Sequence, residues 1–439
     1  MLRCFATARR PLEKPTFRGL ASFTGAFPSE TLQHLAAGGP NVFAAFTMFA
    51  NEHDAVNLGQ GFPTFGTPDF VKEAAARAVS EDHNQYSRPG GHPRLNGVLA
   101  DFYAPRFKKK LDPLCNVTVF NGAQGALFNI ILSFCDAGDE IAVIEPFFDA
   151  YHKGAMLVGA KTKGVPLRLP SGGSSSAADF KLDLGELDEV LNERTRLLIL
   201  NTPHNPTGKV FSVDELQAIS DVVRRYPDLI VVSDEVYEMS AFGGVDQHHR
   251  FAQCCGDDMF ERTISLYSAG KTFSCTGWRI GYAIAPENLS APLIASQGAI
   301  NFCSPSPLEV AVSMSMHAAQ ENNYFAELAK RLEGKQRRFA ALLEAAGMRP
   351  VLADGGYFLL AETSGIVLPE EEQPSSKARD WRVAEYLTEH LGVTGIPTSP
   401  FYISKGNASL AENTIRLCFA RRDSELDEAG KRLAGLRHL

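Results

Sequence analysis

A single lysine, Lys271, stands in a stretch of small residues and hydroxyl groups. The run before it, Thr263 to Tyr267, has the pattern of a short strand, so Lys271 follows the carboxyl end of a strand, where open α/β sheets bind ligands. Ser268 and its neighbours offer hydroxyls and amides to an anion, and Arg279 adds a charge suited to a phosphate. A lysine in a loop can also be solvated and idle, but this setting favours a reactive amine beside a phosphate site.

Pyridoxal phosphate (PLP) is the cofactor that fits such a site, because it is held by a lysine Schiff base and needs an acid at its ring nitrogen. The run Leu229 to Val232 is typical of a buried strand, and Asp234 lies two positions beyond it. We expect Asp234 to keep the ring nitrogen protonated, although a helix N-cap or a surface acid is the alternative. Tyr237 then follows, with a hydroxyl that can donate to the phenolic oxygen of the cofactor.

Apolar runs alternate with helical patterns from about residue 117 to 270, which predicts a parallel-rich sheet with crossover helices. Asn205 follows one such run, 196–200, just as Asp234 and Lys271 follow the next two. The sequence therefore predicts that these side chains meet at one edge of the sheet. Asn205 can donate to the phenolic oxygen of the cofactor and to a substrate carboxylate.

A glycine turn leads from the predicted strand 117–120 into a helix that Gly122, Ala123 and Gln124 open. Free amides and the helix dipole make such a turn a phosphate site. Tight packing alone is the alternative reading of the glycine. With Lys271 nearby, we favour the phosphate site.

These motifs together resemble the class I/II PLP-dependent aminotransferases of PLP fold type I. Within that family the chain is similar to the kynurenine aminotransferase, glutamine transaminase K and cysteine-S-conjugate β-lyase subfamily, over roughly residues 40 to 435. The stretches that carry the resemblance are 57–63 (Asn-Leu-Gly-Gln-Gly-Phe-Pro), 84–86 (Asn-Gln-Tyr), 144–151 (Ile-Glu-Pro-Phe-Phe-Asp-Ala-Tyr), 201–209 (Asn-Thr-Pro-His-Asn-Pro-Thr-Gly-Lys), 234–237 (Asp-Glu-Val-Tyr) and 268–274 (Ser-Ala-Gly-Lys-Thr-Phe-Ser).

The resemblance implies an α/β fold like that of aspartate aminotransferase. A large domain would contain a mixed, mostly parallel, seven-stranded sheet, and a smaller domain would be α+β. The implied divisions are a tail or transit peptide at 1–25, an N-terminal segment joining the small domain at 26–70, the large PLP-binding domain at 71–326 and the small C-terminal domain at 327–439.

The resemblance also implies roles for single residues. Lys271, Asp234 and Tyr237 would be catalytic. Phe148 would stack on the cofactor ring, with Phe147 as the alternative. The implied cofactor-binding set is Gly122, Ala123, Gln124, Phe148, Asn205, Asp234, Tyr237, Ser268, Lys271, Arg279 and Tyr86, and the implied substrate-binding set is Gly61, Asn205, Arg416, Phe43 and Tyr86.

Three of these assignments carry further expectations. Arg416 would clamp the substrate α-carboxylate, a role that its spacing in the run 414–420 does not indicate by itself. Tyr86 would reach the site of a neighbouring subunit, which implies a homodimer with shared active sites. Phe43 stands where the subfamily usually has tryptophan and Gln124 where it often has tyrosine, so the side-chain pocket differs in shape and hydrogen bonding.

The implied activity is transamination of aromatic or large neutral amino acids, of the kynurenine, glutamine, phenylalanine and methionine class, with a 2-oxo acid. It would follow a ping-pong mechanism, with β-elimination of cysteine S-conjugates as a possible side reaction. A dedicated PLP-dependent C–S β-lyase and a non-enzymatic protein of the same fold are the alternatives.

Composition limits the remaining classes. The 439 residues carry a formal net charge of −8, which argues against a nucleic-acid partner, and the apolar runs are far shorter than the roughly 20 residues that span a membrane. The eight cysteines form no C-x-x-C pair, and no second ligand pair accompanies the pair at 254–255, so we expect no metal site.

The amino terminus contains Arg3, Arg9 and Arg10 with no acidic residue before Glu13. This pattern resembles a mitochondrial transit peptide. Because the segment is short, a plain tail on a cytoplasmic protein is the alternative.

Overall fold

The structure is a computed structural model that describes residues 41–244, 247–368 and 377–438. Residues Pro40–Leu439 form one compact unit. The predicted tail or transit peptide at 1–25 lies outside the described residues. No helix in the described ranges is both long enough and apolar enough to cross a membrane.

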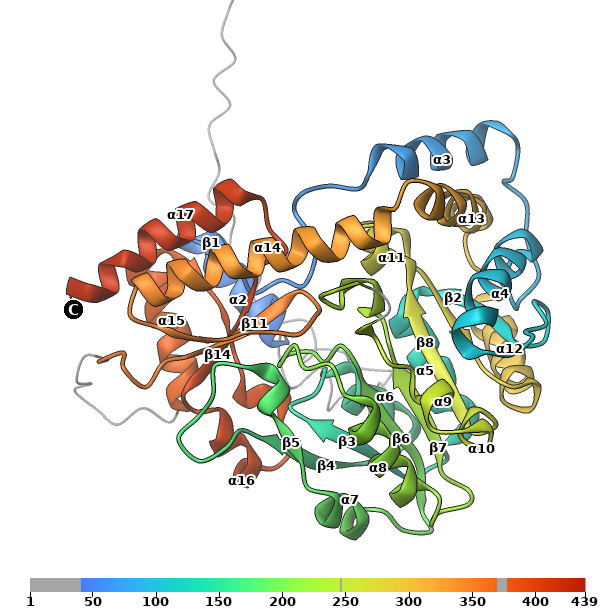
Figure 1. Ribbon diagram of the computed structural model, residues 1–439, viewed down its shortest axis with the longest axis horizontal. Coiled ribbons are helices and arrows are strands. Elements are labelled where there is room, and N and C mark those ends of the chain that lie inside the picture. Colours follow the sequence, from blue (N-terminus) through green and yellow to red (C-terminus); the bar gives the residue numbers. More distant parts are fainter. Residues whose placement is uncertain (1–40, 245–246, 369–376, 439) are drawn as a thin grey trace, which may run out of the picture. The chain divides into compact units, whose positions relative to one another are not determined.

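An eight-stranded sheet lies at the centre of the fold (Figure 1). Its strands, in spatial order, are β2 (Val117–Asn121), β9 (Ile280–Ile284), β8 (Thr263–Ser268), β7 (Ile230–Asp234), β6 (Thr195–Asn201), β3 (Glu140–Glu145), β4 (Lys161–Arg168) and β5 (Lys181–Leu182). The strands from β8 to β4 run parallel, whereas β9 is antiparallel to both of its neighbours. The predicted mixed, mostly parallel sheet is confirmed, with eight strands instead of seven; the two-residue β5 pairs antiparallel with β4 at one edge.

Helices cover both faces of this sheet. Successive residues of β3, such as Ile141 and Ala142, belong to two different apolar clusters, because successive side chains of a strand point to opposite faces. β3 is buried at every position, as expected for a parallel strand covered on both sides. One cluster includes residues of α5 (Gly122–Phe134), α6 (Ala150–Val158) and α12 (Glu287–Asn301); the other includes residues of α7 (Leu184–Val190), α8 (Val213–Val223) and α9 (Phe251–Cys254).

The strands β6, β7 and β8 are neighbours, so the residues that follow them meet at one edge. Asn201 pairs in register with Asp234, and Asp234 with Leu266. Asn205 lies in the turn after β6, and Lys271 lies in the short helix α11 (Ala269–Thr272), which begins directly after β8. This is the arrangement predicted from the alternation of strands and helices.

A second, antiparallel sheet contains β10 (Arg349–Val351), β11 (Phe358–Glu362), β14 (Thr414–Cys418) and β13 (Ile396–Pro397). The helices α14 (Tyr324–Ala345), α15 (Arg379–Leu391) and α17 (Asp423–Leu433) pack on this part of the chain (Figure 1). The segment after α2 (Val42–Glu52) joins it too, since β1 (Val56–Asn57) pairs with β12 (Val393–Thr394). The predicted domain boundaries after 70 and 326 stay predictions; the second falls inside α14.

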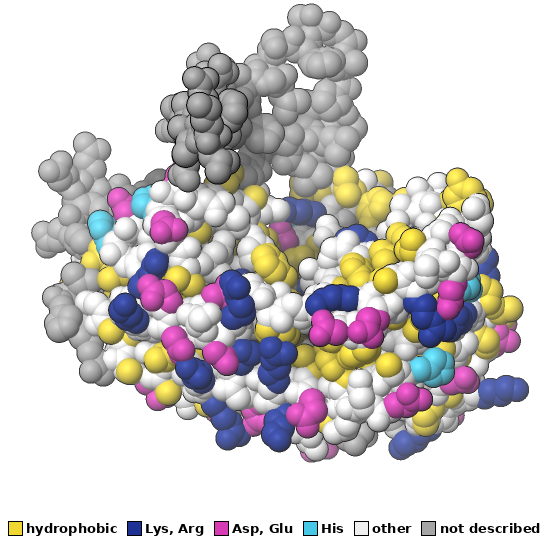
Figure 2. Space-filling model, turned by 90° about the horizontal axis from the view of Figure 1, so that it is seen from above, with side chains coloured by type: hydrophobic (Ala, Val, Ile, Leu, Met, Phe, Trp, Pro, Cys, Tyr) yellow, Lys and Arg dark blue, Asp and Glu magenta, His cyan; other side chains and the backbone are white. Residues whose placement is uncertain are grey.

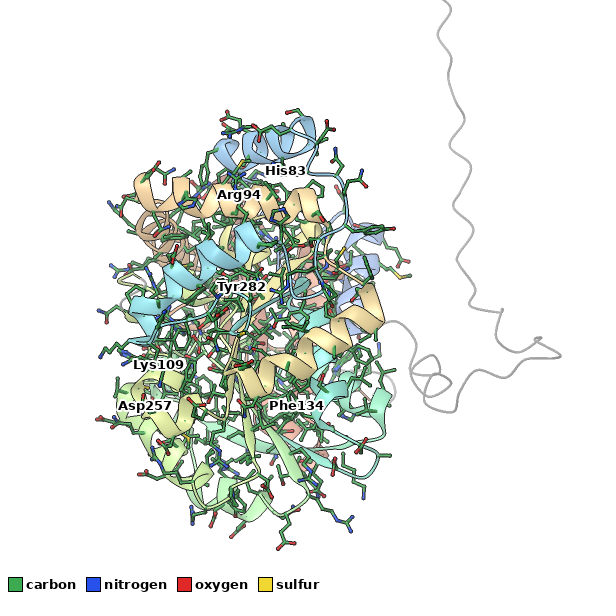
Figure 3. The ribbon with its side chains drawn as sticks, turned by 90° about the vertical axis from the view of Figure 1, so that its right-hand side faces the viewer. His83, Arg94, Lys109, Phe134, Asp257 and Tyr282 are labelled. Atoms are coloured by element: carbon green, nitrogen blue, oxygen red, sulfur yellow. The ribbon has the colours of Figure 1, made fainter. Side chains whose placement is uncertain are left out.

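Two more helices, α3 (Asp69–Ser80) and α4 (Pro93–Phe107), both pack against α13 (Ser306–Glu321), and α4 also packs on β2. Figure 3 shows α4 crossing in front of Tyr282, which is buried and lies 3.1 Å from the hydroxyl of Tyr103. Just past α4, Lys109 pairs at 2.9 Å with Asp257 of α10 (Asp257–Phe260). On the face shown in Figure 2, basic and acidic side chains are interspersed.

Glu145, at the end of β3, ties the large sheet to the C-terminal part of the chain. It is fully buried, and its carboxylate accepts hydrogen bonds from the backbone N–H of Ile403 at 2.6 Å and from Nδ2 of Asn407 at 2.7 Å. We expect Glu145→Ala to lower the free energy of unfolding by about 2 kcal/mol or more, because it removes two hydrogen bonds to a charged group, each worth about 1.5–3 kcal/mol. The shift of the midpoint of urea unfolding measures this loss of stability. Glu81→Ala, which removes an exposed carboxylate, should change stability by less than about 0.5 kcal/mol; equal losses would contradict the assigned role of Glu145.

Candidate active site

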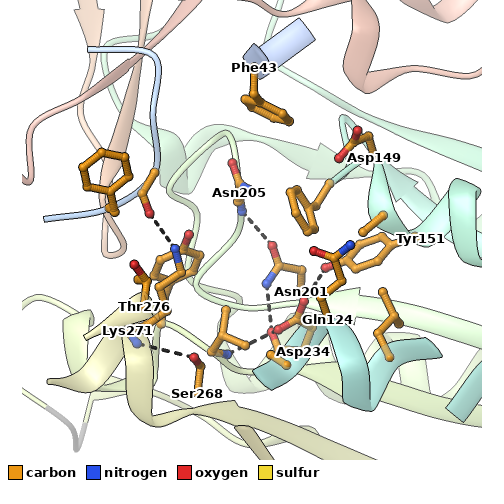
Figure 4. A pocket seen from close by; sticks show the side chains of 18 of the residues that line it. Phe43, Gln124, Asp149, Tyr151, Asn201, Asn205, Asp234, Ser268, Lys271 and Thr276 are labelled. Atoms are coloured by element: carbon orange, nitrogen blue, oxygen red, sulfur yellow. Dashed lines mark hydrogen bonds between the residues drawn. The ribbon is translucent and has the colours of Figure 1, made fainter. Parts of the chain in front are cut away.

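A cavity of about 380 Å³ lies at the edge where β6, β7 and β8 end (Figure 4). Side chains from both sheets and from α2 line it, so segments far apart in the sequence form one site. It brings together most of the predicted site residues: Phe43, Gly61, Ala123, Gln124, Phe148, Asn205, Asp234, Tyr237, Ser268, Lys271, Arg279 and Arg416. Their roles remain predictions that this geometry supports.

Lys271 points into the cavity from α11. The hydroxyl of Ser268 caps this helix and accepts a hydrogen bond from the Lys271 backbone N–H, and Tyr357 donates to the Lys271 carbonyl. The amine Nζ donates to the carbonyl oxygen of Gly61 at 2.5 Å. Burial lowers the pKa of the Lys271 amine to about 8, and the nearby charges of Arg416 and Arg279 act in the same direction. About one fifth of this amine is therefore neutral at pH 7.4, far more than at the ordinary lysine pKa.

Asp234 ends β7 with its carboxylate in the same cavity. Oδ2 accepts a hydrogen bond from the hydroxyl of Tyr151 at 2.5 Å (Figure 4). Burial raises the pKa of Asp234 to about 6, against the opposing effect of the Tyr151 hydrogen bond. No ion pair to Asp234 is found within the described ranges. A buried carboxylate without a cation is suited to a protonated ring nitrogen.

Tyr151 and Asn201 are site residues that sequence reasoning missed. Asn201 donates from Nδ2 to the Asp234 carbonyl at 2.8 Å, and its Oδ1 accepts from the backbone N–H of Asn205 at 2.7 Å. It thus fixes the turns after two neighbouring strands relative to each other. Its position as the last residue of a buried strand was a usable signal, and Tyr151 closes the 144–151 motif.

Arg416 enters the cavity from β14 of the small sheet. Its side chain is buried, and it donates to Oδ1 of Asn205 at 3.0 Å and to the Gly59 carbonyl at 2.5 Å. No carboxylate pairs with it in the part of the chain that the structure describes. Burial lowers the pKa of Arg416 to about 10, yet the group stays charged at neutral pH. An unpaired, buried guanidinium fits the predicted clamp for a carboxylate.

Aromatic rings surround this guanidinium. Its carbon lies 4.0 Å from the ring centre of Phe358, 4.9 Å from that of Phe43 and 5.2 Å from that of Phe401. Phe148 lines the cavity, whereas Phe147 is buried against Tyr151, so of the two candidates Phe148 is the one available to a cofactor ring. Sequence reasoning missed Phe358 and Phe401.

The predicted phosphate corner lies where α5 begins. Gly122 has φ of 81°, and a Cβ there would lie 2.4 Å from Nη2 of Arg279, so only glycine lets the guanidinium lie against this turn. Gly281 of β9 allows an equally close approach, since its Cβ would lie 2.4 Å from the Ala123 nitrogen. The helix amides and the charge of Arg279 are suited to an anion, as the sequence predicts for this turn.

Two predicted site residues are not among those that line the cavity: Gly122, which lies against Arg279, and Tyr86. Tyr86 lies on the surface. Its side chain is 82% exposed and packs edge-to-face on Phe302 with 5.0 Å between ring centres. This position is compatible with the predicted role in a neighbouring subunit, which a single chain does not test.

One group of described residues, Glu235, Glu238 and His248, has metal-ligand spacing. Arg250 lies among them, donates to Glu238 and lies 3.8 Å from Glu235, and His248 lies 2.8 Å from Glu235. The guanidinium of Arg250 thus supplies a positive charge to both carboxylates, so ion pairs and hydrogen bonds among these residues account for the group.

Comparisons with known proteins place the chain in a family. Residues 53–433 match the family described as aminotransferase class I and II. The kynurenine–oxoglutarate transaminase of Dictyostelium discoideum is 39% identical over 415 residues, which cover 91% of this chain and 94% of that protein. Among solved structures, a putative kynurenine aminotransferase from Saccharomyces cerevisiae matches with a TM-score of 0.87 and 30% identity, covering 92% of this chain and 98% of that one. An Escherichia coli protein with a methionine aminotransferase function matches with a TM-score of 0.83 and 30% identity, covering 93% and 100%. The chain therefore belongs to the class I and II aminotransferases and is an aminotransferase with the aspartate aminotransferase-like fold.

Proposed function

We propose that this chain uses PLP to transfer amino groups between 2-oxo acids and amino acids with aromatic or large neutral side chains. The observation that carries the proposal is one cavity in which an amine of lowered pKa, an unpaired carboxylate and an unpaired guanidinium face one another among aromatic rings. The names of the relatives, which include kynurenine and methionine aminotransferases, support the substrate class.

The cavity has a donor or acceptor for each part of the cofactor. Lys271 would bind the aldehyde and Asp234 the ring nitrogen. Burial raises the pKa of Tyr237, which keeps its hydroxyl protonated as a donor to the phenolic oxygen. The turn at Gly122 and the guanidinium of Arg279 would hold the phosphate. When bound, PLP supplies an electron-withdrawing ring that stabilises the negative charge left on a substrate carbon after its proton departs.

The substrate is oriented by charge and then by shape. Arg416 binds the α-carboxylate, assisted by the side-chain amide of Asn205, which already contacts the guanidinium. Nζ of Lys271, once free and in its unprotonated form, would take the proton from Cα and hold it as an ammonium group that can return it. The rings of Phe43 and Phe148, 6.3 Å apart, bound the space next to the clamp and favour a flat or long apolar side chain.

The same proton removal favours loss of a leaving group on Cβ, so β-elimination of cysteine S-conjugates is proposed as a side reaction. Analysis of products distinguishes the two, because elimination releases pyruvate, ammonia and a thiol. Membership of an aminotransferase family argues against the non-enzymatic alternative and against a dedicated lyase.

A homodimer and a mitochondrial location are further proposals. The exposed Tyr86 supports the dimer, since a second subunit would cover it and give it a partner site. The location is supported by the arginines at 3, 9 and 10, which lie outside the described residues; a cytoplasmic location is the alternative.

Lys271→Ala should abolish both transamination and β-elimination, because it removes the base and the attachment point of the cofactor. Turnover of phenylalanine and of a cysteine S-conjugate measures the two reactions. Lys72→Ala, which removes an exposed amine 2.7 Å from Asp69, should leave both rates unchanged. Turnover by the Lys271 variant above background would refute the assignment.

Attachment of the cofactor to Lys271 should accelerate as pH rises through about 8, since only the neutral amine attacks an aldehyde. The lowered pKa means that the neutral form appears near pH 8 instead of near the ordinary lysine value of 10.5. To measure this rate, PLP is added to the cofactor-free protein at a series of pH values. The attached cofactor is trapped with borohydride after set times and is quantified by mass spectrometry. A midpoint near 10.5 would show that burial does not activate this amine.

Phe43→Ala should reduce kcat/KM for kynurenine and phenylalanine about tenfold, the effect of losing about 1.4 kcal/mol of ring contact. The reduction for glutamine should be smaller, because its side chain has no ring. Phe49→Ala is a matched control on the same helix, since Phe49 packs on His53 with 4.4 Å between ring centres and does not line the cavity. Equal losses for all three donors would show that Phe43 acts only through Arg416.

A further inference from the structure

The segment Gly59–Phe62 passes the cavity with an unusual set of hydrogen-bond partners. Leu58, just before it, is held by backbone bonds, donating to Thr394 at 2.8 Å and accepting from Cys418 at 2.8 Å. Within the described ranges, none of the next four carbonyl groups accepts a bond from a backbone N–H. Two of its four residues, Gly59 and Gly61, are glycines, and glycine loses more backbone freedom on folding than any other residue type.

Side-chain cations bind all four carbonyls instead. Arg416 donates to Gly59 at 2.5 Å, and Lys271 donates to Gly61 at 2.5 Å. Arg421 donates to the other two, to Gln60 at 2.6 Å and to Phe62. Two of these cations belong to the proposed reaction, whereas Arg421 does not line the cavity.

Arg421 has no role in the function described above. Its side chain is 2% exposed, and it makes no ion pair with any described carboxylate. Its guanidinium lies 5.2 Å from the ring centre of Phe62. The next residue, Arg422, is different: its side chain is 63% exposed and pairs with Glu425 at 3.1 Å. Burying a guanidinium without a carboxylate is costly, so a contribution from the contacts of Arg421 must offset that cost.

We propose that Arg421 is a positioning residue that fixes the segment Gly59–Phe62 and thereby the substrate carboxylate site at Arg416; this rests on the proposed function. By holding two of the four carbonyls, it keeps the other two aimed at Arg416 and Lys271. Carbonyl dipoles stabilise the three cations without cancelling their charge, so the site stays positive for an anionic substrate. Burial is the main cause of the lowered pKa of Arg416, and the charge of Arg421 acts in the same direction.

The test compares Arg421→Met, which keeps the length and removes the charge, with Arg421→Lys and with Arg422→Met as the matched control. The first measurement is the Kd of 3-phenylpropionate, an unreactive carboxylate, by calorimetry on the PLP-loaded protein. The second is kcat and KM for phenylalanine, with the visible absorbance of the bound cofactor recorded alongside. Because the calorimetry needs no turnover, a wild type that binds the carboxylate but does not transaminate refutes the proposed function and not this inference.

Arg421→Met should raise both the Kd and the KM at least tenfold, while kcat and the cofactor absorbance change by less than threefold. Arg421→Lys should lie between it and the wild type, because an ammonium lacks the fork that spans two carbonyls. If the methionine variant does not fold, the lysine variant alone decides, with a raised Kd as the expected result. An unchanged Kd in either folded variant overturns the inference, as does an equal increase in Arg422→Met.

Discussion

The site depends on one constraint, the parallel order of β8, β7 and β6. Because parallel strands point the same way, the residues that follow them collect at a single edge. The register brings Asn201 opposite Asp234, and the Asn201 side chain then links the two turns. The crossover helices bury both faces of the sheet, so the strands that end at this edge are packed on both sides.

Charge is kept available at this edge. The acid of the site, Asp234, is bonded to a tyrosine hydroxyl, and the cations Lys271 and Arg416 are bonded to carbonyls and an amide. None of the three forms an ion pair with a described residue, although all are withdrawn from water. Burial consequently moves the pKa of each of these three groups toward pH 7. Neutral or weakly charged partners leave the full charge of each group for the cofactor and the substrate.

The small sheet supplies what the large sheet lacks. Arg416 and Phe358 come from β14 and β11, and Phe401 comes from the connection after β13. The pairing of β1 with β12 carries the segment Gly59–Phe62 to the same place, where Arg421 holds it. Glu145 connects the two parts through its bonds to Ile403 and Asn407. The proposed carboxylate clamp and most of the proposed cofactor site thus come from separate sheets that meet at one cavity.

The sequence alone determined the sheet class and the positions of Asn205, Asp234 and Lys271, because apolar strands and the residues after them are local patterns. It also indicated the glycine turn at Gly122, since a turn into a helix is local too. Arg416 and Phe43 came only from the resemblance, as nothing near them in the chain marks a site. Only the tertiary structure revealed the roles of five further residues, because each contacts partners that are distant in the sequence. These residues are Tyr151, Asn201, Phe358, Phe401 and Arg421. The availability of charge at the site is likewise a tertiary property, since a pKa depends on burial and on neighbours that the chain assembles only when it folds.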